Sequence, residues 1–270
     1  MIGCDHMGRL FAVIDTETTW YDRVMSIGIV IADYSDYSIK EKLYYVIKPE
    51  YKEGGMFSSQ LKKSRGTKLD VLSRKEAINN IKKMLDTYKV DFIFAYNANF
   101  DYKHLPELAS YLWIDIMRIA AYRQYNDKLP HNLEYCKTGR LKTGYGVEPI
   151  YSILAKKRYV EYHNAICDAE DEMLIMMMLN KEFEDYYIGA INSNILINKF
   201  KETKKEENKK KNCININNYK CGDVILHEMY GKGVIVDITN MQLCSIKFGN
   251  NVKNIDLILS IEQGYVIKVK

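Results

Sequence analysis

The chain has 270 residues, of which 47% are hydrophobic and 27% are charged. This composition allows a sizeable buried core and excludes a chain that is disordered throughout, and the length suits one large or two modest domains. The 39 basic and 35 acidic residues leave a net charge of +4, which is too small to demonstrate a polyanionic partner but permits one if the basic residues cluster.

The cysteines and the apolar runs bear on cellular location. Six cysteines are scattered without a Cys-x-x-Cys pair, which argues against a zinc site and against a disulfide framework and favours a reducing compartment. No apolar run approaches the roughly 18 residues that span a membrane, and no apolar signal-peptide core is evident near the N-terminus. We therefore expect a cytoplasmic protein with no membrane partner.

The first element is an apolar run over residues 10–14 that ends in two acids. A run of five apolar residues with two β-branched members predicts a strand buried on both faces. Asp15 and Glu17 then share one face, because strand side chains alternate. Like charges this close repel each other unless a cation lies between them, and oxygen ligands favour Mg²⁺ or Mn²⁺ over zinc. The alternative is a strand that runs into a polar turn.

The next stretches predict the neighbours of this strand. Apolar residues at 24–32 and 37–47 flank a break of turn composition, which indicates an antiparallel hairpin beside the first strand. The polar residues 50–72 predict an irregular connection. Ser73 and Glu76 form a capping-box pattern that opens a helix.

A second strand, predicted over residues 90–95, also ends in a polar cluster. Strands and helices in this order favour an α/β domain with a mixed sheet. Open α/β sheets bind ligands beyond the carboxyl ends of their strands, so Asp101 is expected to approach the first two acids. The alternative makes Asn99 the N-cap of a helix over residues 100–112 and Asp101 an ordinary acid of its first turn.

The middle of the chain predicts smaller elements. A short strand is expected at residues 113–116. Residues 117–125 and 129–137 then have helical spacing, and residues 147–157 predict a further helix.

A helix beginning near Asn164 predicts the last part of an acidic site. This start leaves His163 at the mouth of the helix and puts Asp168 about one turn inside. Four carboxylates without a cysteine ligand suit a two-metal site for phosphoryl displacement, and a neutral imidazole is able to take a proton from water. The alternative is that His163 is an ordinary polar residue.

The composition changes after residue 190. A mixed-charge run rich in Asn and Lys predicts a linker over residues 191–218, which divides a domain of residues 1–190 from a domain of residues 219–270. Short strands separated by glycine turns in the last domain predict a small antiparallel β-barrel.

Three motifs in the first domain resemble those of a known family. Asp15-Thr-Glu-Thr, Asn97-Ala-Asn-Phe-Asp101 and His163-Asn-Ala-Ile-Cys-Asp168-Ala, in this order, are similar to the motifs of the DEDDh branch of DnaQ-like (DNA polymerase III epsilon-like) 3′–5′ exonucleases. The resemblance covers about residues 9–179. It implies a ribonuclease-H-like α/β fold in which helices flank a mixed five-stranded sheet.

The resemblance also implies an activity and a set of roles. The activity is release of nucleoside 5′-monophosphates from a single-stranded or frayed 3′ end of DNA or RNA, with two Mg²⁺ or Mn²⁺ ions as cofactors. Asp15 would bind both ions, Glu17 and Asp168 the ion that carries the attacking water, and Asp101 the other ion, while His163 would be the base.

Residues beside these ligands are candidates for binding the terminal nucleotide. They are Thr16, Thr18, Thr19, Trp20 and Asn97. Thr19-Trp20 stand where the family often has Gly-Leu. Trp20 is expected either to stack on a base, a contact worth about 1–3 kcal/mol, or to pack under the following loop.

The C-terminal segment resembles a second module. Residues 222–235, with Ile246-Lys-Phe248 further on, are similar to the Tudor-like module that ends helicases of the UvrD/PcrA type. The resemblance implies an SH3/Tudor-like barrel that docks nucleic acid, a polymerase, a helicase or a transcription protein. The alternative is an appendage that only adds stability.

Two other functions stay open at this point. One is a non-catalytic protein that binds a nucleic-acid end and recruits a repair or transcription partner. The other is an exoribonuclease that trims RNA 3′ ends. All five expected catalytic positions are filled, which favours an enzyme.

Overall fold

The computed structural model describes residues 9–195, 219–238, 243–262 and 264–269. The chain divides into two compact units, Met1–Ile191 and Asn192–Lys270, and each is described by itself. The linker predicted at residues 191–218 lies almost wholly outside the described residues and stays a prediction.

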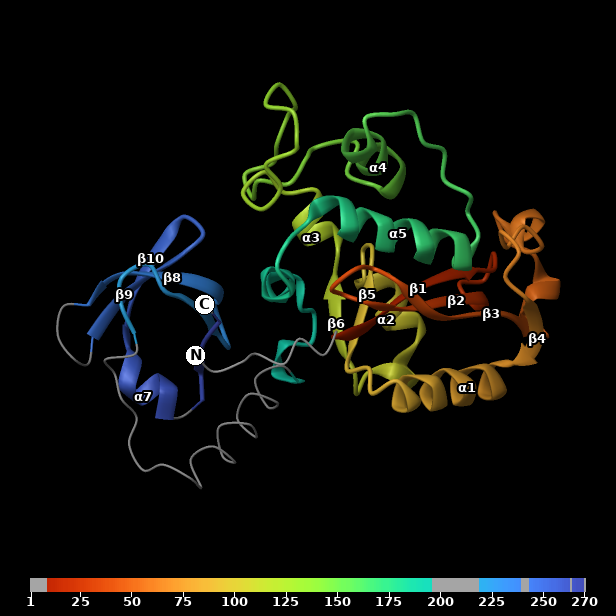
Figure 1. The fold of residues 1–270 in the computed structure, drawn as a ribbon, viewed down its shortest axis with the longest axis horizontal. Helices are drawn as coiled ribbons and strands as arrows, with labels where there is room; N and C mark the ends of the chain where they lie inside the picture. Colours follow the sequence, from red (N-terminus) through yellow and green to blue (C-terminus); the bar gives the residue numbers. More distant parts are fainter. Residues whose placement is uncertain (1–8, 196–218, 239–242, 263, 270) are drawn as a thin grey trace. The chain divides into compact units, whose positions relative to one another are not determined.

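The first unit is built on a mixed sheet that, among the described residues, has six strands (Figure 1). The strands are β1 (Leu10–Thr18), β2 (Val24–Asp33), β3 (Ile39–Lys48), β4 (Leu69–Ser73), β5 (Phe92–Ala95) and β6 (Leu112–Asp115). Their order is β4-β3-β2-β1-β5-β6. β2 runs antiparallel to both of its neighbours, β1 and β3, as the hairpin prediction requires. In contrast, β4 pairs in parallel with β3, and β5 pairs in parallel with both β1 and β6.

The prediction of a five-stranded sheet is therefore wrong by one strand, because the described sheet has six. Residues 50–72 were expected to be irregular; they contain the 3₁₀ turns η1 (Glu50–Glu53) and η2 (Ser58–Gln60), and then β4 at the sheet edge. All five residues of β4 are partly or fully exposed. Because an edge strand of this kind buries no continuous apolar run, the sequence pattern does not reveal it.

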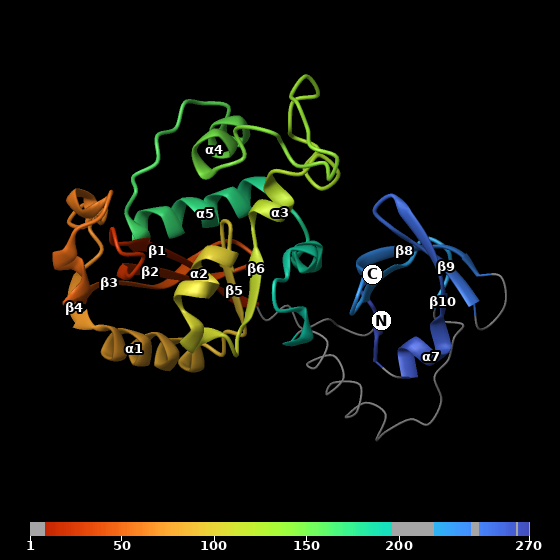
Figure 2. The ribbon, with the colours of Figure 1, turned by 180° about the vertical axis from the view of Figure 1, so that it is seen from behind.

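Helices cover both faces of this sheet (Figures 1 and 2). They are α1 (Arg74–Thr87), α2 (Asn99–His104), α3 (Met117–Ala120), α4 (Val147–Ala155) and α5 (Ala165–Leu179), with 3₁₀ turns η3 (Pro106–Leu108) and η4 (Phe183–Gly189). α5 packs on β1 and β2 from one side, and α1 packs below β3 and β4 from the other. The predicted capping box of Ser73 and Glu76 is present at the start of α1. None of the described helices is long and apolar enough to cross a membrane.

Two helix predictions are wrong in extent. The helix expected over residues 100–112 ends at His104, because a proline at position 106 disfavours helical backbone in the residue before it. Its N-cap is Ala98, not Asn99.

Residues 117–137 are also less helical than their spacing suggests. Only α3 forms, and residues 129–137 contain no described helix. The buried Asn126 donates its side-chain N–H to the Ala120 carbonyl at 2.7 Å. This side-chain bond takes the place of the backbone bond that would have continued the helix.

The second unit is built on an antiparallel sheet that, within its described part, has five strands in the order β10-β9-β8-β7-β11. Its elements are β7 (Val224–His227), β8 (Gly231–Ile238), β9 (Leu243–Phe248), β10 (Asn251–Asp256), α7 (Leu257–Glu262) and β11 (Val266–Lys268). β10 ends at Asp256, because the Oδ1 of this residue accepts the N–H of Leu259 at 2.9 Å and thereby caps α7.

Candidate active site

β1 brings Asp15 and Glu17 to one face of the sheet. Ala12 and Ile14 point to the apolar core on the α1 side, so the odd-numbered residues of the strand face α5. Asp15 lies opposite Gly28 of β2, and the β1–β2 register is interrupted after Glu17. Such irregularities end regular pairing and redirect side chains. Here the interruption comes directly after Glu17, the second of the two acids.

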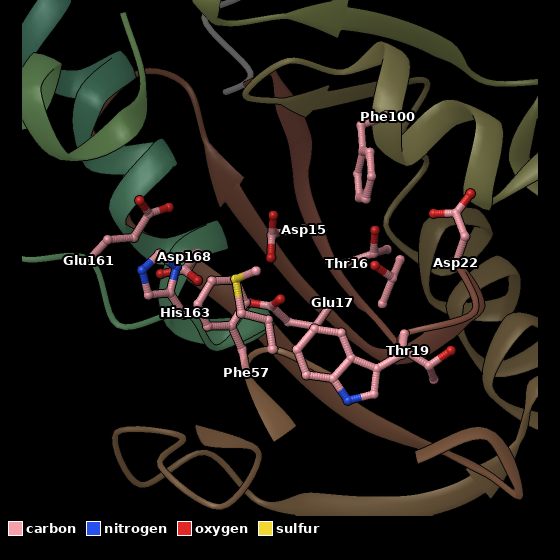
Figure 3. A pocket seen from close by; sticks show the side chains of 13 residues that line it. Asp15, Thr16, Glu17, Thr19, Asp22, Phe57, Phe100, Glu161, His163 and Asp168 are labelled. Atoms are coloured by element: carbon pink, nitrogen blue, oxygen red, sulfur yellow. The ribbon is translucent and has the colours of Figure 1, made fainter. Parts of the chain in front are cut away.

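α5 brings Asp168 to the same face. A Cβ added to Gly28 would lie 2.2 Å from the carbonyl carbon of Ala165, so glycine alone lets the start of α5 lie directly on β2. Asp168 is in the first turn of α5, where its Oδ2 accepts the N–H of Asn164 at 2.7 Å. Asp15, Glu17 and Asp168 thereby offer oxygen atoms that all lie within 4.8 Å of one another. Figure 3 shows the three side chains in the pocket.

Asp101 lies beside this trio rather than within it. It is buried in the first turn of α2, and its Oδ1 accepts the hydroxyl hydrogen of Thr16 at 2.7 Å. Thr16 is on the opposite face of β1 from Asp15. Even so, the two carboxyl groups interact, because burial raises the pKa of Asp15 and the negative charge of Asp101 adds to this shift.

His163 lines the same pocket, directly before the Asn164 N-cap of α5. Its imidazole stacks on Phe57 with ring centroids 3.9 Å apart and planes 11° apart (Figure 3). A ligand atom of His163 lies within 4.8 Å of carboxylate oxygens of Glu161 and Asp168. Burial lowers the pKa of His163, and Glu148 opposes this shift, so the imidazole is neutral at neutral pH.

The acids in and beside the pocket have pKa values above their usual range. Burial, with a smaller contribution from Asp168, raises the pKa of Glu17 to about 8. Burial, with repulsion by Glu161, raises that of Asp168 to about 7. Burial also raises the pKa of Asp101 to about 7 against the opposing hydrogen bond from Thr16, and it raises that of Asp15 well above its usual value. A bound cation would offset the repulsion between these groups.

The candidate nucleotide-binding residues fall into two groups. Thr16, Thr18, Thr19 and Trp20 line the pocket. Asn97 does not, and its left-handed backbone donates its N–H to Asp115 at 2.9 Å. Trp20 is 66% exposed, so it is not buried beneath the following loop. Its backbone N–H donates to the Gly54 carbonyl at 3.0 Å, and its indole ring lies beside Gly54.

Several pocket residues were missed by the sequence reasoning. The lining also contains Asp22, Met56, Phe57, Phe100 and Glu161. Glu161 could have been found, because it lies two residues before His163 in the same segment. Phe57 and Met56 could not, because they come from the connection between β3 and β4, where no pattern was recognised.

One further acid, Glu172, lies behind the pocket. It is buried and accepts the N–H of Tyr96 at 3.0 Å. Burial, with the charge of Asp101, raises its pKa well above the usual value. Its spacing of four residues from Asp168 puts both on one face of α5, which is the signal that could have drawn attention to it.

The donor set fits divalent cations. Oδ1 of Asp168 is buried and has no hydrogen-bond partner among the described residues, and it belongs to the trio of close carboxylates. Carboxylate oxygens without a cysteine are the ligands of hard cations such as Mg²⁺ and Mn²⁺. The fold and the site thus define an α/β protein with an acidic pocket on its central strand, and the oxygen donors of this pocket suit a divalent cation.

Comparison with solved structures finds similar folds. The nuclease domain of 3′hExo, described as a DEDDh family member and bound to rAMP, is 12% identical over 64% of this chain and 92% of that one, with a TM-score of 0.46. E. coli exonuclease I in complex with a dA16 oligonucleotide is 14% identical over 88% of this chain, with a TM-score of 0.46. The match spans about half of the exonuclease I chain, 54%.

No protein-family model and no curated protein sequence matches the chain. Scores and identities of this size leave the function to be argued from the residues of the pocket itself.

Proposed function

We propose that the protein is a metal-dependent 3′–5′ exonuclease, a hydrolase that removes nucleoside 5′-monophosphates from the 3′ end of DNA or RNA. The observation that supports this most directly is the convergence of Asp15, Glu17 and Asp168 within 4.8 Å, with His163 in the same pocket. Carboxylates that repel each other in this way lower the stability of the fold unless a bound cation neutralises their charges.

The proposed division of work follows from the positions of the residues. Asp15, Glu17, Asp101 and Asp168 would hold two Mg²⁺ or Mn²⁺ ions. When bound, such ions stabilise the charge that develops on a phosphoryl group and lower the pKa of water. His163 accepts the proton of the attacking water at an imidazole nitrogen, which is available because burial keeps the ring neutral.

Thr16 and the residues after Glu17 would serve the substrate side of the reaction. The Thr16 hydroxyl fixes the direction of the Asp101 carboxylate. Trp20 and Phe100 line the pocket with exposed rings, and a base stacked on such a ring gains about 1–3 kcal/mol without sequence preference. A pocket lined in this way suits the unpaired terminal nucleotide of a single-stranded or frayed end.

The decisive experiment follows a 5′-labelled oligonucleotide with Mg²⁺ or Mn²⁺, using single-stranded DNA, duplex DNA and RNA in parallel. We expect stepwise shortening from the 3′ end. Asp15→Asn should lower the rate by at least about 100-fold, since losing an ion's stabilisation of the transition state costs several kcal/mol. Asp86→Asn, an exposed change on α1, should act like the wild type.

Two outcomes would point elsewhere. No shortening of any substrate, together with tight binding to 3′ ends, would favour the non-catalytic adaptor over the enzyme. Equal activity in Asp15→Asn would show that the observed cleavage does not come from this pocket.

For the second unit, the proposal is an SH3/Tudor-like barrel that docks nucleic acid or a partner protein of the exonuclease. Its five-stranded antiparallel sheet and its own apolar core support a small independent β-module. The motif around residues 222–235 supports the more specific assignment.

A further inference from the structure

His163 stands in a backbone conformation that its surroundings must maintain. Its φ of 53° lies in the left-handed region, which residues with a side chain seldom adopt and which persists only where neighbouring contacts hold it. Residues 157–164, which carry it, contain no helix or strand. Contacts with other parts of the chain must therefore hold this segment beside Asp15, Glu17 and Asp168.

Residues 55–68, which we call the strap, contact both neighbours of His163. The strap joins η1 to β4 and includes η2. On one side, the guanidinium of Arg65 lies over the Tyr162 ring, 4.1 Å from its centroid. On the other side, the Gln60 carbonyl accepts the side-chain N–H of Asn164 at 2.8 Å.

The strap also contacts the imidazole itself. Phe57 stacks on His163 with nearly parallel rings, as Figure 3 shows. The neighbouring turn of α5 is bound as well, because the Lys63 carbonyl accepts the Sγ–H of Cys167 at 3.2 Å. The strap thus contacts the imidazole ring of His163, both neighbouring residues and the start of α5.

Arg65 is the anchor of this arrangement. Its two terminal nitrogens donate to the two carboxylate oxygens of Asp171 at 2.8 and 2.7 Å, and the Asp171 side chain is only 3% exposed. The hydroxyl of Tyr159 also donates to Asp171. Asp171 on α5 therefore ties down both the strap and the segment that leads to His163.

We propose that Arg65 is a positioning residue for His163, acting through Asp171 and Tyr162, with Phe57 orienting the imidazole ring. This inference rests on the proposed function for its kinetic consequences but not for its geometry. Arg65 does not line the pocket, so it acts through His163 and not on the substrate. The planar, two-pronged guanidinium is what permits a bidentate ion pair and a stacked face at once, and lysine supplies neither.

The kinetic test is a double-mutant cycle in the full-length protein with Arg65→Lys and His163→Asn. Lysine preserves a charge opposite Asp171, so the fold is kept. We expect Arg65→Lys to lower kcat at least about 10-fold with little change in KM, since a displacement of 1 Å at a reacting group costs on the order of 100-fold. In the His163→Asn background the same change should alter kcat by less than about twofold.

The matched control is Arg74→Lys. Arg74 also makes a two-pronged ion pair, to Glu107 at 2.7 and 2.8 Å, but it contacts no residue of the strap or of the His163 segment in the described structure. Its replacement should leave kcat unchanged in both backgrounds. Equal losses from Arg65→Lys with and without His163 would overturn the proposal, because they would show that Arg65 acts on something else.

A measurement that needs no nuclease activity separates this proposal from the proposed function. The five histidines are observed by the NMR signals of their ring Cε1–H groups, and the His163 signal is identified by its loss in His163→Asn. Phe57→Leu should move that signal downfield, because the shielding by the stacked ring is removed, and Arg65→Lys should also displace it.

The two failures are thus distinct. If both variants leave the His163 signal in place, the positioning proposal is wrong even in an active exonuclease. If both move it in a protein that cleaves no nucleic acid, the positioning proposal stands and the proposed function does not.

Discussion

Glu17, Asp101 and Asp168 are buried carboxyl groups whose pKa values have been raised to about 8, 7 and 7. In the unfolded chain such groups titrate near pH 4, so the folded protein binds more protons than the unfolded chain between these limits. Each group therefore contributes stability that is fully present below about pH 4 and is lost as the pH rises through 7 to 8. A divalent cation would remove this cost by neutralising the crowded charges.

This leads to a prediction for Glu17→Gln. Without divalent ions at pH 8, the variant should melt at a higher temperature than the wild type. The reason is that it no longer buries a carboxylate that the neighbouring carboxylates repel. The advantage should shrink towards pH 5.5. With saturating Mn²⁺ at pH 8 the order should reverse, because only the wild type keeps all the proposed ligands and gains the full stabilisation by binding.

Thermal melts at the two pH values, with EDTA or with Mn²⁺, measure this effect. Glu134→Gln removes an exposed carboxylate, 78% accessible, and should melt with the wild type in every condition. A Glu17→Gln variant whose rank does not depend on Mn²⁺ would contradict a cation site at Glu17.

At the scale of elements, the contact between β2 and α5 decides where the pocket lies. α5 can carry Asp168 to the acids of β1 only because Gly28 leaves room for the backbone of Ala165 and Ile166. A methyl group at position 28 would have to push back backbone atoms, which cannot yield as the end of a flexible side chain does.

We therefore expect Gly28→Ala to be destabilising. Overpacking of this kind costs about 1–3 kcal/mol, and for a unit of this size each kcal/mol lowers the melting temperature by about 2–4 °C. The shift of α5 should also weaken stabilisation by Mn²⁺.

The matched control is Gly146→Ala. A Cβ added to Gly146 would meet no atom within 4 Å, so the melting temperature should change by no more than about 2 °C, as for an exposed substitution worth less than 0.5 kcal/mol. A Gly28→Ala variant as stable as this control would show that α5 does not need the close contact.

At the scale of the whole molecule, all pocket residues belong to the first unit. Every lining residue, from Asp15 to Asp168, lies within Met1–Ile191. This unit also has its own apolar core, which is formed by the central strands and α1. Folding and chemistry should therefore both be possible without the second unit.

A fragment of residues 1–191 tests this expectation. It should unfold in one cooperative transition and should keep its stabilisation by Mn²⁺ and its rate on short oligonucleotides to within a few-fold of the full chain. The measurements are thermal melts and the labelled-oligonucleotide assay. A fragment that does not fold, or that folds without binding Mn²⁺, would show that residues after 191 complete the site.

Much of the local structure could be predicted because its causes are local. The capping box of Ser73 and Glu76 requires only a spacing of three residues, and the shared face of Asp15 and Glu17 requires only the alternation of a strand. The predictions that failed depended on partners distant in the sequence or on a single local bond. β4 exists because β3 offers it an edge, and α3 is cut short by the side chain of Asn126.

The same division holds for the candidate site. The sequence by itself determined the chemistry on offer: acids at the end of a buried strand, an acid in the first turn of a helix, and a histidine at its mouth. These follow from residue type and periodicity, which short segments carry within themselves.

Only the tertiary structure decided which groups meet. It joined Asp15, Glu17 and Asp168 while leaving Asp101 on the α2 side, excluded Asn97 from the lining, and added Glu161. It also brought the strap to His163. These outcomes depend on packing at Gly28 and on an ion pair that spans 106 positions of the chain, and no local pattern encodes contacts of that kind.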